Sequence, residues 1–271
     1  KNHFRIISSA AVRTHDKAHI LKHLSKDVEF KDVTDDLICL GIFGPKSREL
    51  LSKITNENLS NEKFKFGTSK NINIGSLKVW TQRLSYVGEL GYELYINKDN
   101  GKEIYDLIVE TGKNFGLTHC GAHTMDTMRM ESGFLHWGHD ISPEENQYEA
   151  GLNFTISYKK PFNFIGKEKL LALKNQKLNR RFVMLILKDS TPGQPLLLHE
   201  EPIYLENEII GKTTSGNYSF NYDKNLSFGY INSELTNEEL LNRDLYIEIE
   251  KKKYEAQILL KPLKQVSFKD I

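Results

Sequence analysis

Residues 83–94 read Arg-Leu-Ser-Tyr-Val-Gly-Glu-Leu-Gly-Tyr-Glu-Leu, with apolar or aromatic side chains alternating along both halves of the stretch. This alternation predicts two short strands. Gly88 and Gly91 interrupt the pattern, and glycine within a strand indicates a bulge or a close approach of the backbone to another group. The stretch therefore predicts a bent, rigid strand that carries two carboxylates and two phenols, which are Tyr86, Glu89, Tyr92 and Glu93.

Two interpretations of this stretch remain open at the level of the residues. In the first, the acidic and aromatic side chains form a site where a flat heterocycle stacks and is hydrogen-bonded. In the second, they belong to a tight hairpin whose glutamates face water. A short motif of this kind matches by chance often enough that neither interpretation prevails on the stretch alone.

The composition favours a small-molecule ligand. The chain has 271 residues, enough for two domains, and its 37 basic and 36 acidic side chains are well mixed, giving a formal charge of +1. We therefore expect no nucleic-acid partner. Since no apolar run approaches the roughly 18 residues of a membrane span and no signal-type segment is visible, we also expect no membrane association.

The cysteine content predicts a reducing compartment. Cys39 and Cys120 are far apart in a chain large enough to fold without disulfides. We expect the protein to be cytoplasmic, or in the mitochondrial matrix if it is eukaryotic. The chain opens on Lys1 and runs directly into a strand-like segment, so we also expect its natural beginning to lie upstream.

The N-terminal half is predicted to be an α+β layer. Residues 37–43 are almost continuously apolar, which is typical of a strand buried on both faces. The remaining elements come from period-2 alternation or from apolar residues at helical spacing. The predicted strands are 4–8, 28–34, 37–43 and 72–80, and the predicted helices are 14–24, 47–54 and 100–111.

The middle of the chain is predicted to contain a short helix and an aromatic loop. Helical spacing covers 122–131 and stops at Gly133, with Met128 and Met130 as core residues. The loop at 134–140 contains His136 and His139, but a zinc site needs a third protein ligand and none stands at a suitable spacing, so we expect no metal. Residues 149–156 are predicted to enter a new strand.

The C-terminal part is predicted to be a small β-barrel or sandwich. A helix over 167–175 precedes the strands, which are predicted at 181–187, 202–205, 209–214, 226–231, 245–249 and 254–260. Tyr218, Phe220 and Tyr222 alternate and either close over a ligand or fill the core, and we favour the core. We divide the chain into an α+β region, 1–176, and a β-barrel domain, 177–271.

Several motifs stand in a fixed order along the chain: Arg83-x-x-Tyr86-x-Gly88-Glu89-x-Gly91-x-Glu93, Met128-Arg-Met-Glu131-x-Gly133, Trp137-Gly138-x-Asp140-Ile141, Glu149-Ala-Gly-Leu152, Phe164-Ile-Gly-Lys167, Gly211-Lys-Thr-Thr-Ser-Gly216 and Ser227-Phe-Gly-Tyr-Ile231. Their order and spacing resemble the aminomethyltransferase family, the T-protein of the glycine cleavage system. Two segments, His136-Trp-Gly-His-Asp140 and Gly44-Pro-Lys-Ser-Arg48, are closer to the folate domains at the C-terminal end of dimethylglycine and sarcosine dehydrogenases.

The resemblance implies T-protein-like α/β domains with antiparallel sheets, followed by an all-β barrel. It also implies that tetrahydrofolate binds in a central hole and accepts a methylene group from an amine donor at N5 and N10. Glu93 corresponds to the family's pteridine-binding glutamate, with Glu89 and Tyr86 in the same wall. We add Tyr92 and Trp137 as candidate cofactor-binding residues. A carboxylate accepts adjacent pteridine N–H groups well, and aromatic faces supply stacking area.

Two departures from the family pattern limit the site. The family's catalytic aspartate lies upstream of the segment that corresponds to 4–7, so no catalytic residue is assigned in this sequence. An arginine that usually stands four residues before Arg129 and helps to hold the folate tail is Met125 here. We expect Arg129 itself to be structural, paired with Asp126 or Glu131.

Three functions remain open under this resemblance. The chain is expected to belong to a dimethylglycine or sarcosine dehydrogenase-like protein, with FAD bound only if an oxidase domain precedes it. It could instead be a stand-alone T-protein whose partner is a lipoyl carrier, or a non-catalytic folate-binding relative. A carboxylate about ten residues before Phe4 would favour an enzyme.

Overall fold

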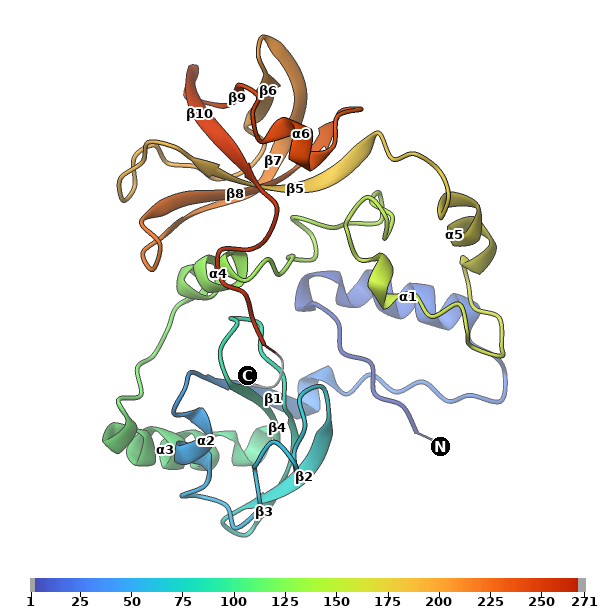
Figure 1. Ribbon diagram of the computed structural model, residues 1–271. Helices are drawn as coiled ribbons and strands as arrows, with labels where there is room; N and C mark the ends of the chain where they lie inside the picture. Colours follow the sequence, from blue (N-terminus) through green and yellow to red (C-terminus); the bar gives the residue numbers. More distant parts are fainter. Residues whose placement is uncertain (1–2, 268–271) are drawn as a thin grey trace. The chain divides into compact units, whose positions relative to one another are not determined.

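The structure is a computed structural model that describes residues 3–267 (Figure 1). Contacts within the chain divide it into two compact units, which we call the first unit, residues 1–125 with 266–271, and the second unit, residues 126–265. The predicted boundary at 176 and 177 concerns the change from mixed to all-β structure, and it stays a prediction. Each unit is described by itself below.

The first unit contains an antiparallel sheet of four strands in the order β1-β4-β3-β2. The long β4 lies inside this sheet, with Glu93 opposite Gly41 on one side and opposite Gln82 on the other. The strands are β1 (Leu37–Phe43), β2 (Ser69–Ile74), β3 (Leu77–Gln82) and β4 (Gly91–Asn97).

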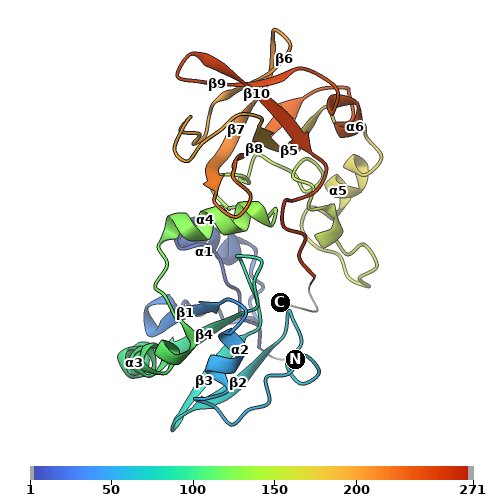
Figure 2. The ribbon, with the colours of Figure 1, turned by 60° about the vertical axis from the view of Figure 1, so that its left-hand side comes forward.

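Two helices cover one face of the sheet, which we call the closed face (Figures 1 and 2). They are α2 (Ser47–Leu51) and α3 (Gly101–Gly112). Because side chains alternate between the faces of a strand, every second residue of β2, β3 and β4 points into the resulting core. The core includes Leu50, Leu51, Ile72, Ile74, Val79, Tyr92, Leu94, Ile96, Ile104 and Ile108.

Several predictions for the first unit are wrong. Residues 4–9 and 28–33 are irregular, and residues 72–80 form two strands that turn at Gly75, whose φ is +59°. β1 lies at the edge of its sheet and is not buried on both faces. The predicted helix at 14–24 is present as α1 (Arg13–His23), but none of its residues is buried. Residues 83–90 form a loop, and only the second half of the opening stretch is a strand.

The second unit begins within α4 (Ala122–Glu131), whose bounds match the prediction. The chain leaves α4 through Gly133 at φ +74°, and Met130 is buried against Leu226 and Phe228, as predicted for a core methionine. The predicted strand at 149–156 is wrong, because this segment contains only the 3-10 turn Asn153–Thr155. α5 (Lys167–Leu173) follows.

The C-terminal strands close into a barrel of order β10-β5-β8-β7-β6-β9, so the barrel is the correct one of the two predicted architectures. Its interior is filled by aliphatic side chains. Of the alternating aromatics, Tyr218 is buried as predicted, whereas Phe220 is 72% exposed. The elements are β5 (Arg180–Leu187), β6 (Pro202–Leu205), β7 (Glu208–Ser219), β8 (Lys224–Asn232), α6 (Asn237–Leu240), β9 (Leu245–Ile249) and β10 (Lys252–Leu259).

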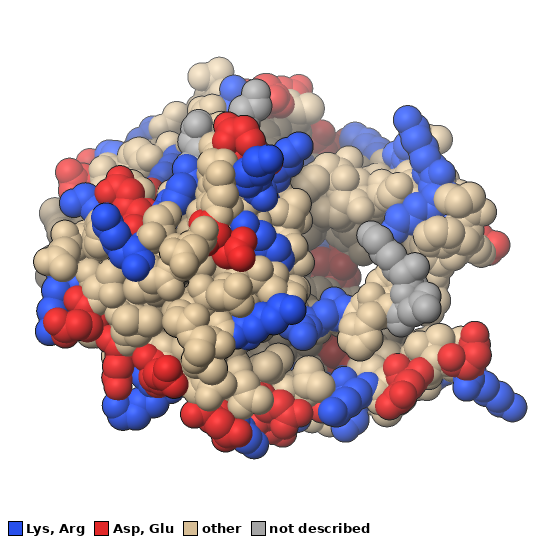
Figure 3. Space-filling model, turned by 90° about the horizontal axis from the view of Figure 1, so that it is seen from below, with Lys and Arg blue, Asp and Glu red and all other residues tan. Residues whose placement is uncertain are grey.

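Short 3-10 turns complete the secondary structure at Ala10–Val12, Thr34–Asp36, Lys98–Asn100 and Lys113–Phe115. Among residues 3–267, no helix has the length and apolar character needed to cross a membrane. On the face shown in Figure 3, basic and acidic side chains are interspersed, in agreement with the balanced charge of the sequence.

Candidate functional site

The side of the first-unit sheet opposite the closed face carries polar and aromatic side chains, and we call it the open face. Alternation along β4 places Glu93 and Tyr95 on this face, while their neighbours Tyr92 and Leu94 are fully buried on the closed face. Strand pairing brings three further residues onto the open face beside Glu93 and Tyr95, which are Cys39, Trp80 and Gln82.

Glu93 and Tyr95 are connected by a hydrogen bond. The Tyr95 hydroxyl donates to Oε2 of Glu93 at 2.7 Å, and Nε2 of Gln82 donates to the Tyr95 hydroxyl at 3.2 Å. The rings of Trp80 and Tyr95 are in contact, with 4.7 Å between centroids. Burial and the hydrogen bond to Glu93 raise the pKa of Tyr95 well above its usual range. Tyr95 therefore acts as a hydrogen-bond donor to the carboxylate at neutral pH.

Two glycines shape the surface next to Glu93. A Cβ on Gly91 would lie 2.4 Å from Cδ1 of Phe43 and 2.6 Å from the carbonyl oxygen of Leu84, and a Cβ on Gly41 would lie 2.5 Å from Cε2 of Phe43. The Phe43 ring thus occupies the space that side chains at both positions would need. Gly91 is required for this close approach, as the glycine pattern of the sequence predicted.

The loop at residues 83–90 is held in place by hydrogen bonds. The Ser85 hydroxyl accepts from the backbone N–H groups of Val87 and Glu89 at 3.3 and 3.2 Å. At its end, the carbonyl oxygen of Leu90 accepts from the Gly44 N–H at 2.8 Å and from the Ser47 hydroxyl at 3.1 Å. These bonds attach the loop to the segment that joins β1 to α2.

The structure places the predicted site residues of the first unit in three environments. Glu93 is half-buried on the open face, and Tyr86 and Glu89 are half-buried within the 83–90 loop. Tyr92 is different: it is fully buried in the core, 5.8 Å from the Phe64 ring between centroids, and its hydroxyl accepts from Nε of Arg48 at 3.2 Å. We correct the prediction for Tyr92, because a one-residue step along a strand moves its side chain to the opposite face.

Trp80 also carries a cation on its ring. The Arg5 guanidinium carbon lies 4.1 Å from the Trp80 ring centroid, within the range of a cation–π interaction. Arg5 belongs to the irregular segment that precedes α1. The Trp80 ring therefore already accepts a planar group on its face.

In the second unit, Asp140 is the centre of a buried hydrogen-bond network. Arg129 and Asp140 are 2% and 1% exposed, and Nη1 of Arg129 lies 2.5 Å from Oδ2 of Asp140. The hydroxyls of Thr214 and Ser215 donate to Oδ1 at 2.6 and 2.7 Å, and the Tyr230 hydroxyl donates to the Asp140 carbonyl oxygen at 2.8 Å. Arg129 thus has the structural role predicted for it, and its Nε is also 3.3 Å from Asp126.

This network fixes the aromatic loop at 134–141 on the barrel. The backbone N–H of His136 donates to Asp140 at 2.8 Å, and Gly138, at φ +93°, closes a turn beside Trp137. Trp137 is 37% exposed. The His136 and His139 rings are 4.6 Å apart, and burial followed by the charge of His139 lowers the pKa of His136. Among residues 3–267, no group of three or more His, Cys, Asp or Glu side chains is placed to hold a metal ion.

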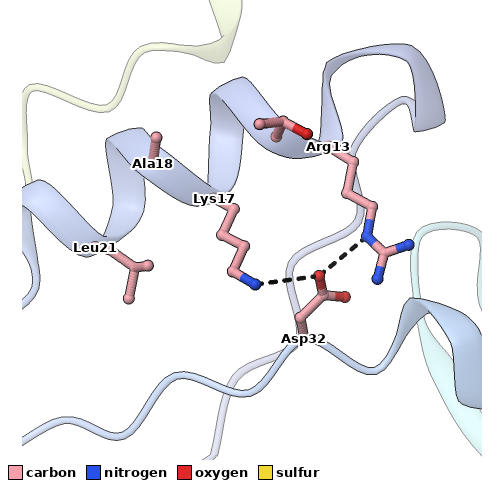
Figure 4. A pocket seen from close by; sticks show the side chains of 6 residues that line it. Arg13, Lys17, Ala18, Leu21 and Asp32 are labelled. Carbon is pink, nitrogen blue, oxygen red and sulfur yellow. Dashed lines mark hydrogen bonds and ion pairs between the residues drawn. The ribbon is translucent and has the colours of Figure 1, made fainter.

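A shallow pocket of about 490 Å³ lies beside α1 in the first unit (Figure 4). Its two cations face a carboxylate: Asp32 is 3.0 Å from Nε of Arg13 and 3.9 Å from Nζ of Lys17. Hydrogen bonds from Thr34 and Arg13 hold the pKa of Asp32 well below its usual range. Since its cations are already neutralised and none of its lining residues lies on the open face, we do not take this pocket as the ligand site.

Sequence analysis missed Trp80, Gln82 and Tyr95. Tyr95 shares the alternation of Glu93, so the parity of the strand would have identified it. Trp80 and Gln82 are a different case, because their position depends on the register of β3 against β4. Residues 83–90, which connect β3 to β4, form an irregular loop where a strand was predicted. The register of the two strands therefore could not be read from the sequence.

Comparison with known families matches both parts of the chain. The profile described as the GCVT N-terminal domain matches residues 1–160, and that of the glycine cleavage T-protein C-terminal barrel domain matches residues 180–264.

Comparison with individual proteins gives relatives of two kinds. The chain is 35% identical over 265 residues to mitochondrial dimethylglycine dehydrogenase of Homo sapiens, covering 96% of this chain but 30% of the relative. It is 30% identical over 260 residues to an aminomethyltransferase of Geobacillus sp. (strain WCH70), covering 96% of this chain and 69% of the relative. Aminomethyltransferase T of the glycine cleavage system from Bartonella henselae has the same fold, with a TM-score of 0.77, 18% identity, and coverage of 94% of this chain and 67% of that one.

Proposed function

The chain belongs to the glycine cleavage T-protein family, and we propose that it binds tetrahydrofolate on the open face of its first-unit sheet and takes part in folate-dependent one-carbon transfer. The observation that carries this proposal is the half-buried Glu93 carboxylate, which the Tyr95 hydroxyl orients on the open face. The family match is what directs the choice of folate as the ligand.

The chemistry of the open face fits a pteridine. The ring edge of a pteridine presents adjacent N–H donors, for which a carboxylate is the best acceptor in a protein. The Trp80 ring carries the Arg5 guanidinium on its face, and a pteridine that replaced Arg5 there would gain about 0.5–1.5 kcal/mol of aromatic stacking beyond the burial of area. On the β1 side, Gly41 lies opposite Glu93, and the Phe43 ring occupies the position that a Gly41 side chain would take. Glu93 would bind the pteridine edge, and Tyr86 and Glu89 would line the adjoining loop.

Tetrahydrofolate would supply the nitrogen nucleophiles N5 and N10 that take up the one-carbon unit. The residues of this chain would contribute by orienting the folate and by excluding water, since a reactive methylene donor hydrolyses in solvent. Orientation of two reactants in one site can supply about 7–11 kcal/mol of the barrier. No catalytic acid or base is assigned within the described residues.

We further propose that the one-carbon donor is a methylated amine and that the product is 5,10-methylenetetrahydrofolate. The likeness to dimethylglycine dehydrogenase supports this choice. The chain spans about three tenths of the length of that relative, so a flavin-dependent oxidase domain with FAD would be its functional partner. A mitochondrial matrix or cytoplasmic location is consistent with this proposal.

A specific observation also favours a second candidate, a stand-alone aminomethyltransferase that works with a lipoyl carrier. The Geobacillus relative is named aminomethyltransferase, and this chain covers 69% of its length. The two candidates differ in their donor and share the folate site. A donor assay separates them, because dimethylglycine or sarcosine would support transfer only when the chain works with an oxidase.

Calorimetric titration with tetrahydrofolate tests the folate site. We expect saturable binding to the wild-type chain, and Glu93→Ala should weaken it by about 1–3 kcal/mol, the usual cost of removing a charged hydrogen-bond partner. Glu103→Ala, which removes an exposed carboxylate on α3, is the matched control and should bind as the wild type does. If Glu93→Ala folds and binds with unchanged affinity, the proposed site is wrong.

A further inference from the structure

We propose that Tyr95 is a positioning residue for folate, acting through Glu93. The inference rests on the proposed function and adds to it a residue that no comparison assigns. Tyr95 is placed on the same face as Glu93 and two residues further along β4, and its hydroxyl donates to Oε2 of Glu93 at 2.7 Å. The bond fixes the orientation of a side chain that otherwise has three rotatable bonds.

Two neighbours hold Tyr95 itself. Nε2 of Gln82 donates to its hydroxyl at 3.2 Å, which directs the hydroxyl proton toward Glu93. The Trp80 ring, whose centroid is 4.7 Å from that of Tyr95, fixes the phenol from β3. Gln82, Tyr95 and Glu93 thus form a short chain of hydrogen bonds that runs in one direction.

The arrangement leaves Oε1 of Glu93 and the second lone pair of Oε2 to accept bonds from a ligand. A carboxylate that is already oriented loses less side-chain freedom when it binds than one that must be ordered, and this difference appears as affinity. The strand positions explain why the effect is local: residues 93 and 95 are adjacent on one face of β4, and the Tyr95 hydroxyl reaches Glu93 directly.

The test compares Tyr95→Phe with a matched control, Tyr204→Phe. Tyr204 in the barrel donates a similar hydrogen bond, 2.8 Å to Oε2 of Glu248, so its removal deletes the same chemistry away from the open face. We expect Tyr95→Phe to weaken tetrahydrofolate binding by between about threefold and tenfold, the usual value of one hydrogen bond. Tyr204→Phe should leave the affinity unchanged.

A double-mutant cycle separates positioning from packing. If Tyr95 acts through Glu93, Tyr95→Phe should change the affinity by less than about twofold in a Glu93→Ala background, because the group that it positions is gone. A side chain that only supports the fold would weaken binding equally in both backgrounds. Thermal unfolding of each variant shows whether it is folded, and Gln82→Met, which removes the donor to the Tyr95 hydroxyl, gives a second, smaller loss if Tyr95→Phe is unstable.

The outcomes are distinct. Loss of affinity in Tyr95→Phe that disappears in the Glu93→Ala background supports the inference. Unchanged affinity in Tyr95→Phe, or an equal loss in both backgrounds, overturns the inference while the folate site at Glu93 stands. Unchanged affinity in Glu93→Ala alone overturns the proposed function and the inference with it.

Discussion

Tyr92 and Glu93 are adjacent in the sequence and lie in opposite environments. Tyr92 fills the core, and Glu93 faces the open side of the sheet. Composition and motif order identified both, since each belongs to the same Gly-Tyr-Glu stretch. Only the parity of the strand separates them, and a single step in register reverses it. The sequence identified the stretch, and the structure places Tyr92 and Glu93 on opposite faces of β4.

The buried ion pair of Arg129 and Asp140 gives a prediction at this scale. Removing one partner leaves the other charge buried, so Asp140→Asn should lower the free energy of unfolding by about 3–5 kcal/mol. Urea unfolding measures the change. Asp106→Asn, which opens the exposed pair with Lys102 on α3, should leave the free energy unchanged within error. Equal effects of the two substitutions would show that the Asp140 network does not stabilise the fold.

Some helices and strands were predicted more accurately than others. α4 and the barrel strands β6 and β9 were predicted with their observed bounds, because turn residues such as Gly133 and Asn207 bound these elements. Residues 28–33 alternate as a strand does, yet they are irregular, and no strand within residues 3–267 pairs with them. The predicted strand at 72–80 contains the Gly75 turn, where a positive φ folds one run of residues into a hairpin.

Substitution of Gly91 tests how closely β4 packs against the neighbouring Phe43 and Leu84. A methyl group there would meet both the Phe43 ring and the Leu84 carbonyl oxygen, so Gly91→Ala should lower the free energy of unfolding by about 1–3 kcal/mol through overpacking. The matched control is Gly121→Ala, since a Cβ at Gly121 meets no atom within 4 Å. Because the Phe43 ring also covers Gly41, which pairs with Glu93, tetrahydrofolate binding should weaken in Gly91→Ala and persist in Gly121→Ala. Equal stability of the two variants would contradict the close packing.

The whole chain contains separate hydrophobic cores. One lies between the first-unit sheet and its two helices, and another fills the barrel. The sequence predicted the change from α+β to all-β structure, because a polar segment at 175–179 is followed only by strand patterns separated by turn residues. It did not predict that contacts divide the chain within α4, since this division depends on long-range packing that leaves no local pattern.

Separate cores predict separate local stabilities. In native-state hydrogen exchange, Gly91→Ala should speed the exchange of amides in β1–β4 and leave those of β5–β10 as in the wild type, and Asp140→Asn should do the reverse. Each variant serves as the control for the other. Uniform acceleration across the chain in both variants would show that the two cores unfold as one cooperative unit.

The edge position of β1 affects the tendency of the protein to aggregate during refolding. Its sequence, Leu-Ile-Cys-Leu-Gly-Ile-Phe, contains no charge and no proline, and it pairs with a strand on one side only. Uncharged edge strands recruit other chains into intermolecular sheets, whereas a closed barrel offers no edge of this kind. Aggregation from partly unfolded protein should therefore begin at residues 37–43, and a lysine introduced on this strand would act as a gatekeeper against it.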